Sequence, residues 1–200
     1  MLRPVHGAGL AATVLIGIVA GVKVLVAVLG WLTVDADQYT PLGAAVAAAL
    51  SWIWLVAFVV AAITFMVWMH HARLNADTIT SPHQSRFAKL WVYLGWFIPI
   101  ANLYIPYAVM QDIWRGSDRS QPMIGLRQRE PSGLILLWWL CFLFSNVSLT
   151  LPPKYAFEVA VFATISALLS VVAAVLGARV IRQVNDMQIN EQNAFPAPAA

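Results

Sequence analysis

Four apolar runs constrain this chain more than any other feature of its sequence. They cover about residues 10–31, 41–69, 133–150 and 155–181. About 20 apolar residues in a helix are needed to cross the roughly 30 Å hydrocarbon core of a bilayer. The chain is also only 10% charged, whereas about 25% of the residues of a soluble domain carry a charge. The sequence therefore predicts an all-α integral membrane protein.

The positions of the basic residues predict how the spans are oriented. With four spans and a cytoplasmic N-terminus, ten Lys and Arg residues fall on the cytoplasmic side, Lys154 falls outside, and Lys23 lies within the first span. Such a bias is the rule for membrane proteins. We therefore expect a multi-pass protein of the bacterial inner membrane with both termini in the cytoplasm. The net charge of +3 then reflects topology, and no nucleic-acid partner is expected.

A fifth apolar stretch, residues 87–115, complicates this topology. It has no charged residue between Lys89 and Asp112, but a fifth span would abolish the charge bias. Pro99 and Pro106 each lack the N–H that a continuous helix needs, so they predict a broken helix. The expected fold is a membrane four-helix bundle whose broken segment, between the second and third helices, is re-entrant or lies in the interface. A fifth span is the alternative.

The remaining expectations on architecture concern domains and packing. Residues 1–182 are expected to form one transmembrane helical domain, and the polar and then Pro- and Ala-rich stretch 183–200 a disordered tail. Small residues allow close helix packing in lipid, as at Gly17 and Gly21 in the first span. A stripe in the fourth span predicts a contact within the chain, with a homo-oligomer as the alternative; it comprises Ala156, Ala160, Ala163, Ala167, Ser170, Ala174 and Gly177.

Lys23 is the one cation deep within a predicted span, and an intramembrane charge is costly enough to be a candidate site. Glu158 lies just inside the outer end of the fourth span. A lysine side chain can extend several ångströms along a helix to reach a polar partner. We therefore predict an intramembrane ion pair between Lys23 and Glu158, with extension of Lys23 to the outer headgroups as the alternative.

Catalytic and metal-binding patterns give no comparable signal. His70 and His71 are adjacent, and neighbouring helical side chains point about 100° apart, so they do not form the i, i+4 pair that binds a metal. Cys141, the single cysteine, has no base near it in the sequence. Neither an enzymatic activity nor a metal or cofactor is expected.

The most distinctive stretch extends from Trp68 to Asp118. It contains the segments WMHHARLNA, GWFIPIANLYIPY and QDIWRGSD. Over roughly residues 60 to 180 the sequence resembles a family of bacterial membrane proteins named only as domain of unknown function 4328. One departure is His71, where the family pattern has a basic residue. The resemblance implies the fold and a membrane location, and no activity.

Polar and conformationally special residues of this stretch form the predicted functional or structural site. The side chains of Asn75, Asn102 and Asp112 can satisfy the interrupted backbone, pair with Arg73 or Arg115, or contact an anionic ligand. We expect a non-enzymatic membrane module that binds a partner protein or anionic phospholipid headgroups at its cytoplasmic face. A small-solute transporter or channel component is the alternative, although we find no internal repeat. The predicted site comprises Arg73, Asn75, Trp96, Pro99, Asn102, Pro106, Asp112 and Arg115.

Overall fold

A computed structural model describes residues 2–34, 41–80, 85–118, 125–146 and 156–194. No strand occurs in these ranges, so the all-α prediction is confirmed for them. The helices are α1 (His6–Leu32), α2 (Pro41–Ile79), α3 (Trp91–Phe97), α4 (Pro99–Asn102), α5 (Ile105–Gly116), the 3-10 helix η2 (Leu126–Gln128), α6 (Gly133–Asn146) and α7 (Ala156–Ala194).

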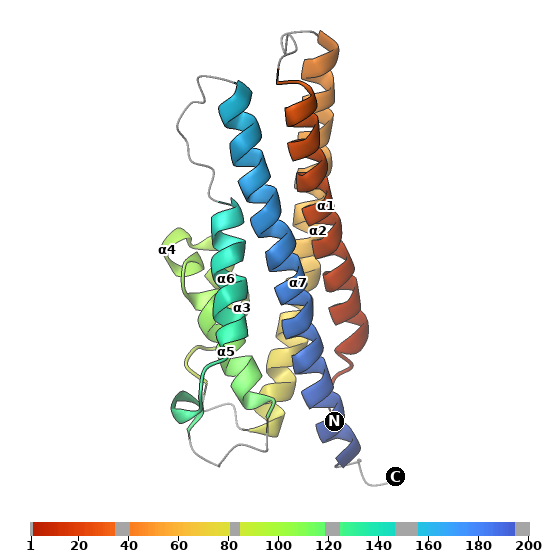
Figure 1. Cartoon of the computed structure of the whole chain (residues 1–200). Helices are drawn as coiled ribbons and strands as arrows, with labels where there is room; N and C mark the ends of the chain where they lie inside the picture. Colours follow the sequence, from red (N-terminus) through yellow and green to blue (C-terminus); the bar gives the residue numbers. More distant parts are fainter. Residues whose placement is uncertain (1, 35–40, 81–84, 119–124, 147–155, 195–200) are drawn as a thin grey trace.

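The long helices run alternately up and down. The most extensive helix contacts are those of α1 with α7, α6 with α7 and α1 with α2. The start of α1, the end of α2 and the end of α7 lie together at one end of the molecule (Figure 1), which we call the terminal end. The short helices α3, α4 and α5 lie beside α6; α4 is near the middle of the molecule, and α3 and α5 are nearer this end (Figure 1).

Within the described ranges, three segments are long and apolar enough to cross a membrane: His6–Leu32, Ala45–Ile79 and Phe157–Glu191. Their outward faces carry large apolar side chains such as Trp52, which is 67% exposed. Extended apolar surfaces of this kind are unusual in soluble proteins and suit a lipid environment. The third predicted span is different, because α6 has 14 residues and measures only about 21 Å at about 1.5 Å per residue. Residues 147–150 of that prediction lie outside the described ranges.

The chain between α2 and α6 is interrupted at both prolines. Ile98 is extended, with φ −88° and ψ 115°, as expected for a residue that precedes proline. Pro99 then begins α4, and Pro106 lies in the first turn of α5. A proline in the first helical turn costs no hydrogen bond, because the N–H it lacks would have no partner there. The prolines therefore start new helices, and α3, α4 and α5 can change direction at each junction.

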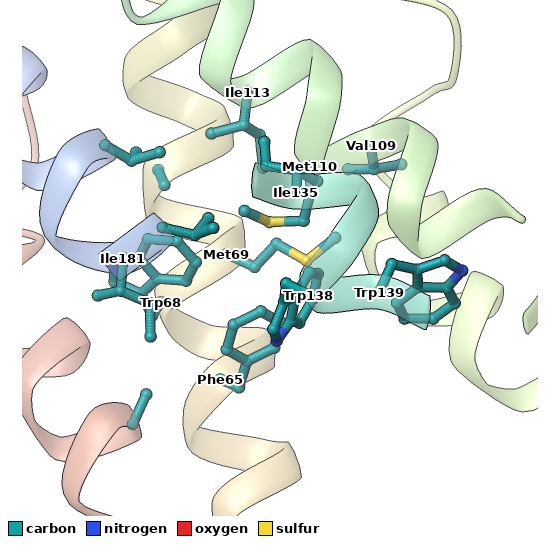
Figure 2. Packing of buried hydrophobic residues seen from close by; sticks show 14 of the residues in the cluster. Phe65, Trp68, Met69, Val109, Met110, Ile113, Ile135, Trp138, Trp139 and Ile181 are labelled. Carbon is teal, nitrogen blue, oxygen red and sulfur yellow. The ribbon is translucent and has the colours of Figure 1, made fainter. Parts of the chain in front are cut away.

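The buried core is concentrated toward the terminal end. Figure 2 shows side chains of α2, α5, α6 and α7 meeting there. Trp68 and Met69 of α2, Met110 and Ile113 of α5, and Ile135 of α6 are fully buried. The helices α2 and α6 have no extensive contact with each other. The short helix α5 joins them because it supplies apolar contacts to both.

The prediction of a disordered tail is wrong for residues 183–194, because α7 continues to Ala194. Val184, Asn185 and Gln188 are buried on this last part of the helix. The Trp68 indole Nε1 donates to Asn185 Oδ1 (2.9 Å). The polar side chains that suggested a solvated tail are instead hydrogen-bonded to α2. Residues 195–200 lie outside the described ranges.

The glycines of α1 pack differently from the prediction. A Cβ at Gly17 or Gly21 would have no atom within 4 Å, so neither glycine marks a close contact in the described structure. Gly9 does mark one, since a Cβ there would lie 2.5 Å from Asn185 Nδ2 and 2.9 Å from Ile181 Cγ2. The α7 stripe lies partly inside, where Ala160 and Ala167 are buried.

Substituting Gly9 by alanine is expected to destabilise the protein by about 1–3 kcal/mol, the usual cost of forcing extra atoms into a packed interior. Asn185 cannot move freely because it holds the Trp68 indole. Gly17→Ala is the matched control on the same helix and should leave the stability unchanged or raise it by up to about 1 kcal/mol. Thermal unfolding in detergent measures both variants. Equal stabilities for the two would contradict the close approach of α1 to α7 at Gly9.

Candidate functional site

Asn75, one of the predicted site residues, joins three parts of the chain at the terminal end. Its Oδ1 accepts from the backbone N–H of Arg3 (2.7 Å), and its Nδ2 donates to the backbone oxygen of Arg3 (2.9 Å) and to Gln188 Oε1 (2.9 Å). Gln188 Nε2 in turn donates to the oxygen of Ala72 (2.9 Å) and to Ser117 Oγ (2.8 Å). Asn75 therefore has a structural role, because these internal partners occupy its amide.

Arg73 is also held by internal contacts. Its Nε donates to Asp77 Oδ1 (3.0 Å) one turn further along α2, and both side chains are buried. A second guanidinium nitrogen donates to the oxygen of Phe87 (3.0 Å). Lys89 Nζ lies 3.7 Å from the other carboxylate oxygen of Asp77. These contacts fasten the segment that precedes α3 to the end of α2.

Asp112 forms an ion pair with Arg86. The carboxylate is 1% exposed, the Arg86 side chain is 20% exposed, and the carboxylate lies 2.8 Å from Arg86 Nη2. It also accepts from the backbone N–H and the Nε of Arg86, both at 2.9 Å. Sequence reasoning considered Arg73 and Arg115 as partners and missed Arg86, because nothing in the sequence indicates that the segment before α3 folds back onto α5.

Arg115 lies near this pair without a direct bond to Asp112 among the described contacts. Its Nε donates to the backbone oxygen of Glu130 (3.4 Å). Burial and then the nearby charge of Arg86 lower the pKa of Arg115, whereas Asp112 raises it. Sequence reasoning also missed Gln111, whose amide exchanges two hydrogen bonds with the backbone of Ser132 (2.8 and 2.9 Å). Gln111 thereby fixes the start of α6 against α5.

Basic side chains on the outside of the terminal end remain available to a ligand. Apart from Lys23, the described basic residues lie in the half of the molecule at the terminal end (Figure 1). They belong to the N-terminal segment, to α5 and the segments beside it, and to the later parts of α2 and α7. Those with exposed side chains are Arg3, Lys89, Arg179 and Arg182.

A cavity of about 500 Å³ lies between α1, α2, α3, α6 and α7, and we call it the central cavity. Most of its wall is apolar, including Phe65, Trp138 and Phe142. Its polar lining consists of Lys23, Trp96, Asn102, Ser145, Asn146 and Ser170. None of the described residues that line it is acidic. Its volume falls in the range of about 300–1,000 Å³ typical of small-molecule sites.

The predicted pair between Lys23 and Glu158 is wrong. Lys23 Nζ donates to the backbone oxygen of Ser145 (2.7 Å) and approaches Asn146 Oδ1 (3.2 Å) and Ser166 Oγ (3.4 Å). Ser166 lies eight residues beyond Glu158 on α7, a rise of about 12 Å. The last carbonyls of a helix lack intrahelical donors and attract cations. Lys23 therefore hydrogen-bonds to the C-terminal end of α6. The sequence predicted that this helix ends at about residue 150 and not at Asn146.

Trp96 and Asn102, both predicted site residues, meet in the central cavity. The indole Nε1 of Trp96 and the Oδ1 of Asn102 are buried, and neither has a hydrogen-bond partner among the described residues. The Trp96 ring itself is fixed by edge contacts with Phe65, Trp139 and Phe142. Buried polar atoms are rarely left without a partner. Trp96 and Asn102 thus bring one unpartnered donor and one unpartnered acceptor to the wall of the cavity.

The predicted site residues thus fall into separate groups. Arg73, Asn75, Asp112 and Arg115 belong to the hydrogen-bonded network of the terminal end, whereas Trp96 and Asn102 line the cavity. The prolines start α4 and α5. No group of three or more His, Cys, Asp or Glu side chains suited to a metal ion occurs in the part of the chain that the structure describes.

Comparison with protein-family models places most of the chain in a known family. The family model described as domain of unknown function (DUF4328) matches residues 34–186. No curated protein and no solved structure is significantly similar to the chain. The matched region begins just after α1 and includes every described helix up to the last part of α7.

Proposed function

This chain belongs to the DUF4328 family, and we propose that it is a four-span, non-enzymatic module of the bacterial inner membrane that binds anionic phospholipid headgroups at its cytoplasmic face. The resemblance predicted from the sequence is confirmed, and its extent is larger than the predicted 60 to 180. In the proposed topology both termini are cytoplasmic, α6 takes the place of the third span, and the segment from α3 to α5 enters and leaves on the cytoplasmic side.

The observation that supports this proposal is the concentration of basic side chains toward the terminal end. Arg3, Lys89, Arg179 and Arg182 are exposed there, whereas Lys23 is enclosed by α6 and α7. Each Lys or Arg near the surface of an anionic membrane contributes about 1 kcal/mol of attraction. A protein partner is the competing occupant of this face.

Cysteine labelling tests the topology. Cys141→Ser removes the single cysteine, after which one cysteine is placed at Gln121 or at Tyr39. A membrane-impermeant maleimide should label the Gln121 position only from the cytoplasmic side and the Tyr39 position only from the outside. Labelling of the Gln121 position from the outside alone would overturn the four-span arrangement.

Lipid binding is tested in nanodiscs by comparing phosphatidylglycerol with phosphatidylcholine. Lys89→Gln and Arg182→Gln should each weaken retention of phosphatidylglycerol about fivefold, the equivalent of about 1 kcal/mol. Lys154→Gln, a lysine expected on the opposite side, serves as the matched control and should have no effect. Equal retention of the two lipids by the unmodified protein would refute headgroup binding and leave a protein partner to be sought by crosslinking.

A further inference from the structure

The central cavity is open toward the surroundings through an apolar side. Val59 and Ile63 of α2 and Phe97 of α3 line the cavity, and they are also 45%, 54% and 73% exposed. In a membrane an exposed apolar surface faces acyl chains. A molecule dissolved in the bilayer can therefore reach the cavity without passing through water.

The polar groups of the cavity lie close to one another along α6. Trp96 contacts the ring of Phe142 (centroids 6.0 Å apart), and Lys23 donates to the oxygen of Ser145, three residues further on. Three residues of a helix rise only about 4.5 Å. The Trp96 ring and the Lys23 ammonium group therefore contact α6 within about one turn of each other, and Asn102 lines the same cavity.

Among the described residues, the charge of Lys23 has no counter-ion in this cavity. The three described groups within hydrogen-bond distance are a backbone oxygen, an amide oxygen and a hydroxyl, all of them neutral. The face of the Trp54 ring, 5.8 Å away, adds a weak attraction. An isolated cation in a low-dielectric site favours an anionic partner. The cavity therefore combines apolar walls, a positive charge, a free donor and a free acceptor.

We propose that the central cavity binds one long-chain carboxylic acid drawn from the bilayer. The alkyl chain packs against the apolar walls, and a carboxyl oxygen accepts from the Trp96 indole. In the ionised form the carboxylate is the counter-ion of Lys23; in the protonated form its O–H donates to Asn102 Oδ1. Of the common single-chain lipids, a carboxylic acid complements all three groups, whereas an alcohol offers no charge and a methyl ester offers neither charge nor donor. This site is independent of headgroup binding at the terminal end.

Quenching of tryptophan fluorescence tests the proposal, because Trp96 and Trp138 line the cavity. The purified full chain in phosphatidylcholine nanodiscs is titrated with a dibrominated 18-carbon acid, with its methyl ester and with the corresponding alcohol. We expect the acid to bind at least about tenfold more tightly than the ester, the typical effect of a hydrogen bond to a charged group, with the alcohol between them. Equal affinities for the acid, the ester and the alcohol would show apolar partitioning only and would overturn the proposal. Quenching that does not saturate with any of the three ligands would also overturn it.

Variants identify the groups responsible. Lys23→Met should reduce the affinity for the acid about tenfold and leave that for the ester unchanged, and Lys23→Arg should restore the preference. Trp96→Phe keeps the ring and removes the donor, so the acid should again bind about tenfold more weakly; Trp52→Phe, at an exposed position, is the control. If Lys23→Met retained the preference for the acid, or if Trp96→Phe bound the acid as tightly as the unmodified chain, the assignment of that residue would be wrong.

A filling variant separates the cavity from other lipid contacts. Ala62 lines the cavity, and Ala62→Leu adds side-chain volume into it, so it should abolish saturable binding of the acid. Ala48→Leu makes the same change at an exposed position of α2 and should bind as the unmodified chain does. Because the added leucine side chain fills open space, Ala62→Leu should remain folded, as unfolding in detergent can verify. Saturable binding that survived in folded Ala62→Leu would overturn the proposed location.

Discussion

Replacing Asp112 by alanine is expected to lower the free energy of unfolding by about 3–5 kcal/mol, the usual cost of removing one partner of a buried ion pair. The carboxylate is 1% exposed and binds Arg86 through three nitrogens. Without it, the guanidinium retains two weaker acceptors, the oxygen of Ala108 and the hydroxyl of Tyr104, and its charge is left uncompensated. Detergent-induced unfolding followed by circular dichroism measures the loss.

The matched control is Asp186→Ala on α7. Asp186 lies 3.8 Å from Arg182 at i, i+4, but the two side chains are 63% and 86% exposed. Such exposed pairs contribute about 0–1 kcal/mol, so this variant should differ little from the unmodified protein. A loss at Asp112 no larger than that at Asp186 would mean that α5 is not held to the preceding segment by this ion pair.

A double variant separates the interaction itself from the cost of an unpaired charge. Asp112→Leu combined with Arg86→Met removes both charges and keeps apolar volume. Replacing a whole buried pair by apolar side chains is often neutral, so the double variant should recover much of the stability lost by Asp112→Leu alone. Additive losses in the two single variants would contradict a direct interaction between the two side chains.

The sequence predicted the features that depend on local physics. Hydrophobic length identified the long helices, and the missing N–H of Pro99 and Pro106 predicted the breaks that precede α4 and α5. Trp96 and Asn102 were singled out as polar-tipped residues of the interrupted stretch 87–115, and both line the central cavity. Signals of this kind need only the residues themselves and their nearest neighbours.

The features that the sequence did not predict depend on contacts between distant segments. Arg86 and Asp112 are 26 residues apart, and no periodicity links a residue before α3 to one within α5. Lys23 was assigned to Glu158 by charge alone, whereas its partners are at the C-terminal end of α6. A cation can be satisfied by neutral carbonyl oxygens, and a search limited to opposite charges overlooks them.

The last part of α7 was also not predicted from the sequence, because its polar residues bond to distant segments. Removing it is expected to have a large effect on stability. A chain that ends at Arg182 should lose at least about 3 kcal/mol of stability, since a buried group left without a partner costs about 1–3 kcal/mol and a buried apolar side chain contributes about 1.5–3 kcal/mol. The Trp68 indole loses its acceptor Asn185, the Ala72 oxygen and the Ser117 hydroxyl each lose a bond from Gln188, and the buried Val184 is removed. Thermal unfolding in detergent compares the shortened and full chains.

A point substitution keeps this prediction testable if the shortened chain does not fold. Gln188→Leu removes the bonds to Asn75, Ala72 and Ser117 at a site that is 1% exposed, so it should cost about 1–3 kcal/mol. Gln183→Leu makes the identical change at an exposed position of the same helix and should be nearly neutral. If both variants were as stable as the unmodified chain, residues 183–194 would contribute nothing to the fold, as their polar composition alone suggested.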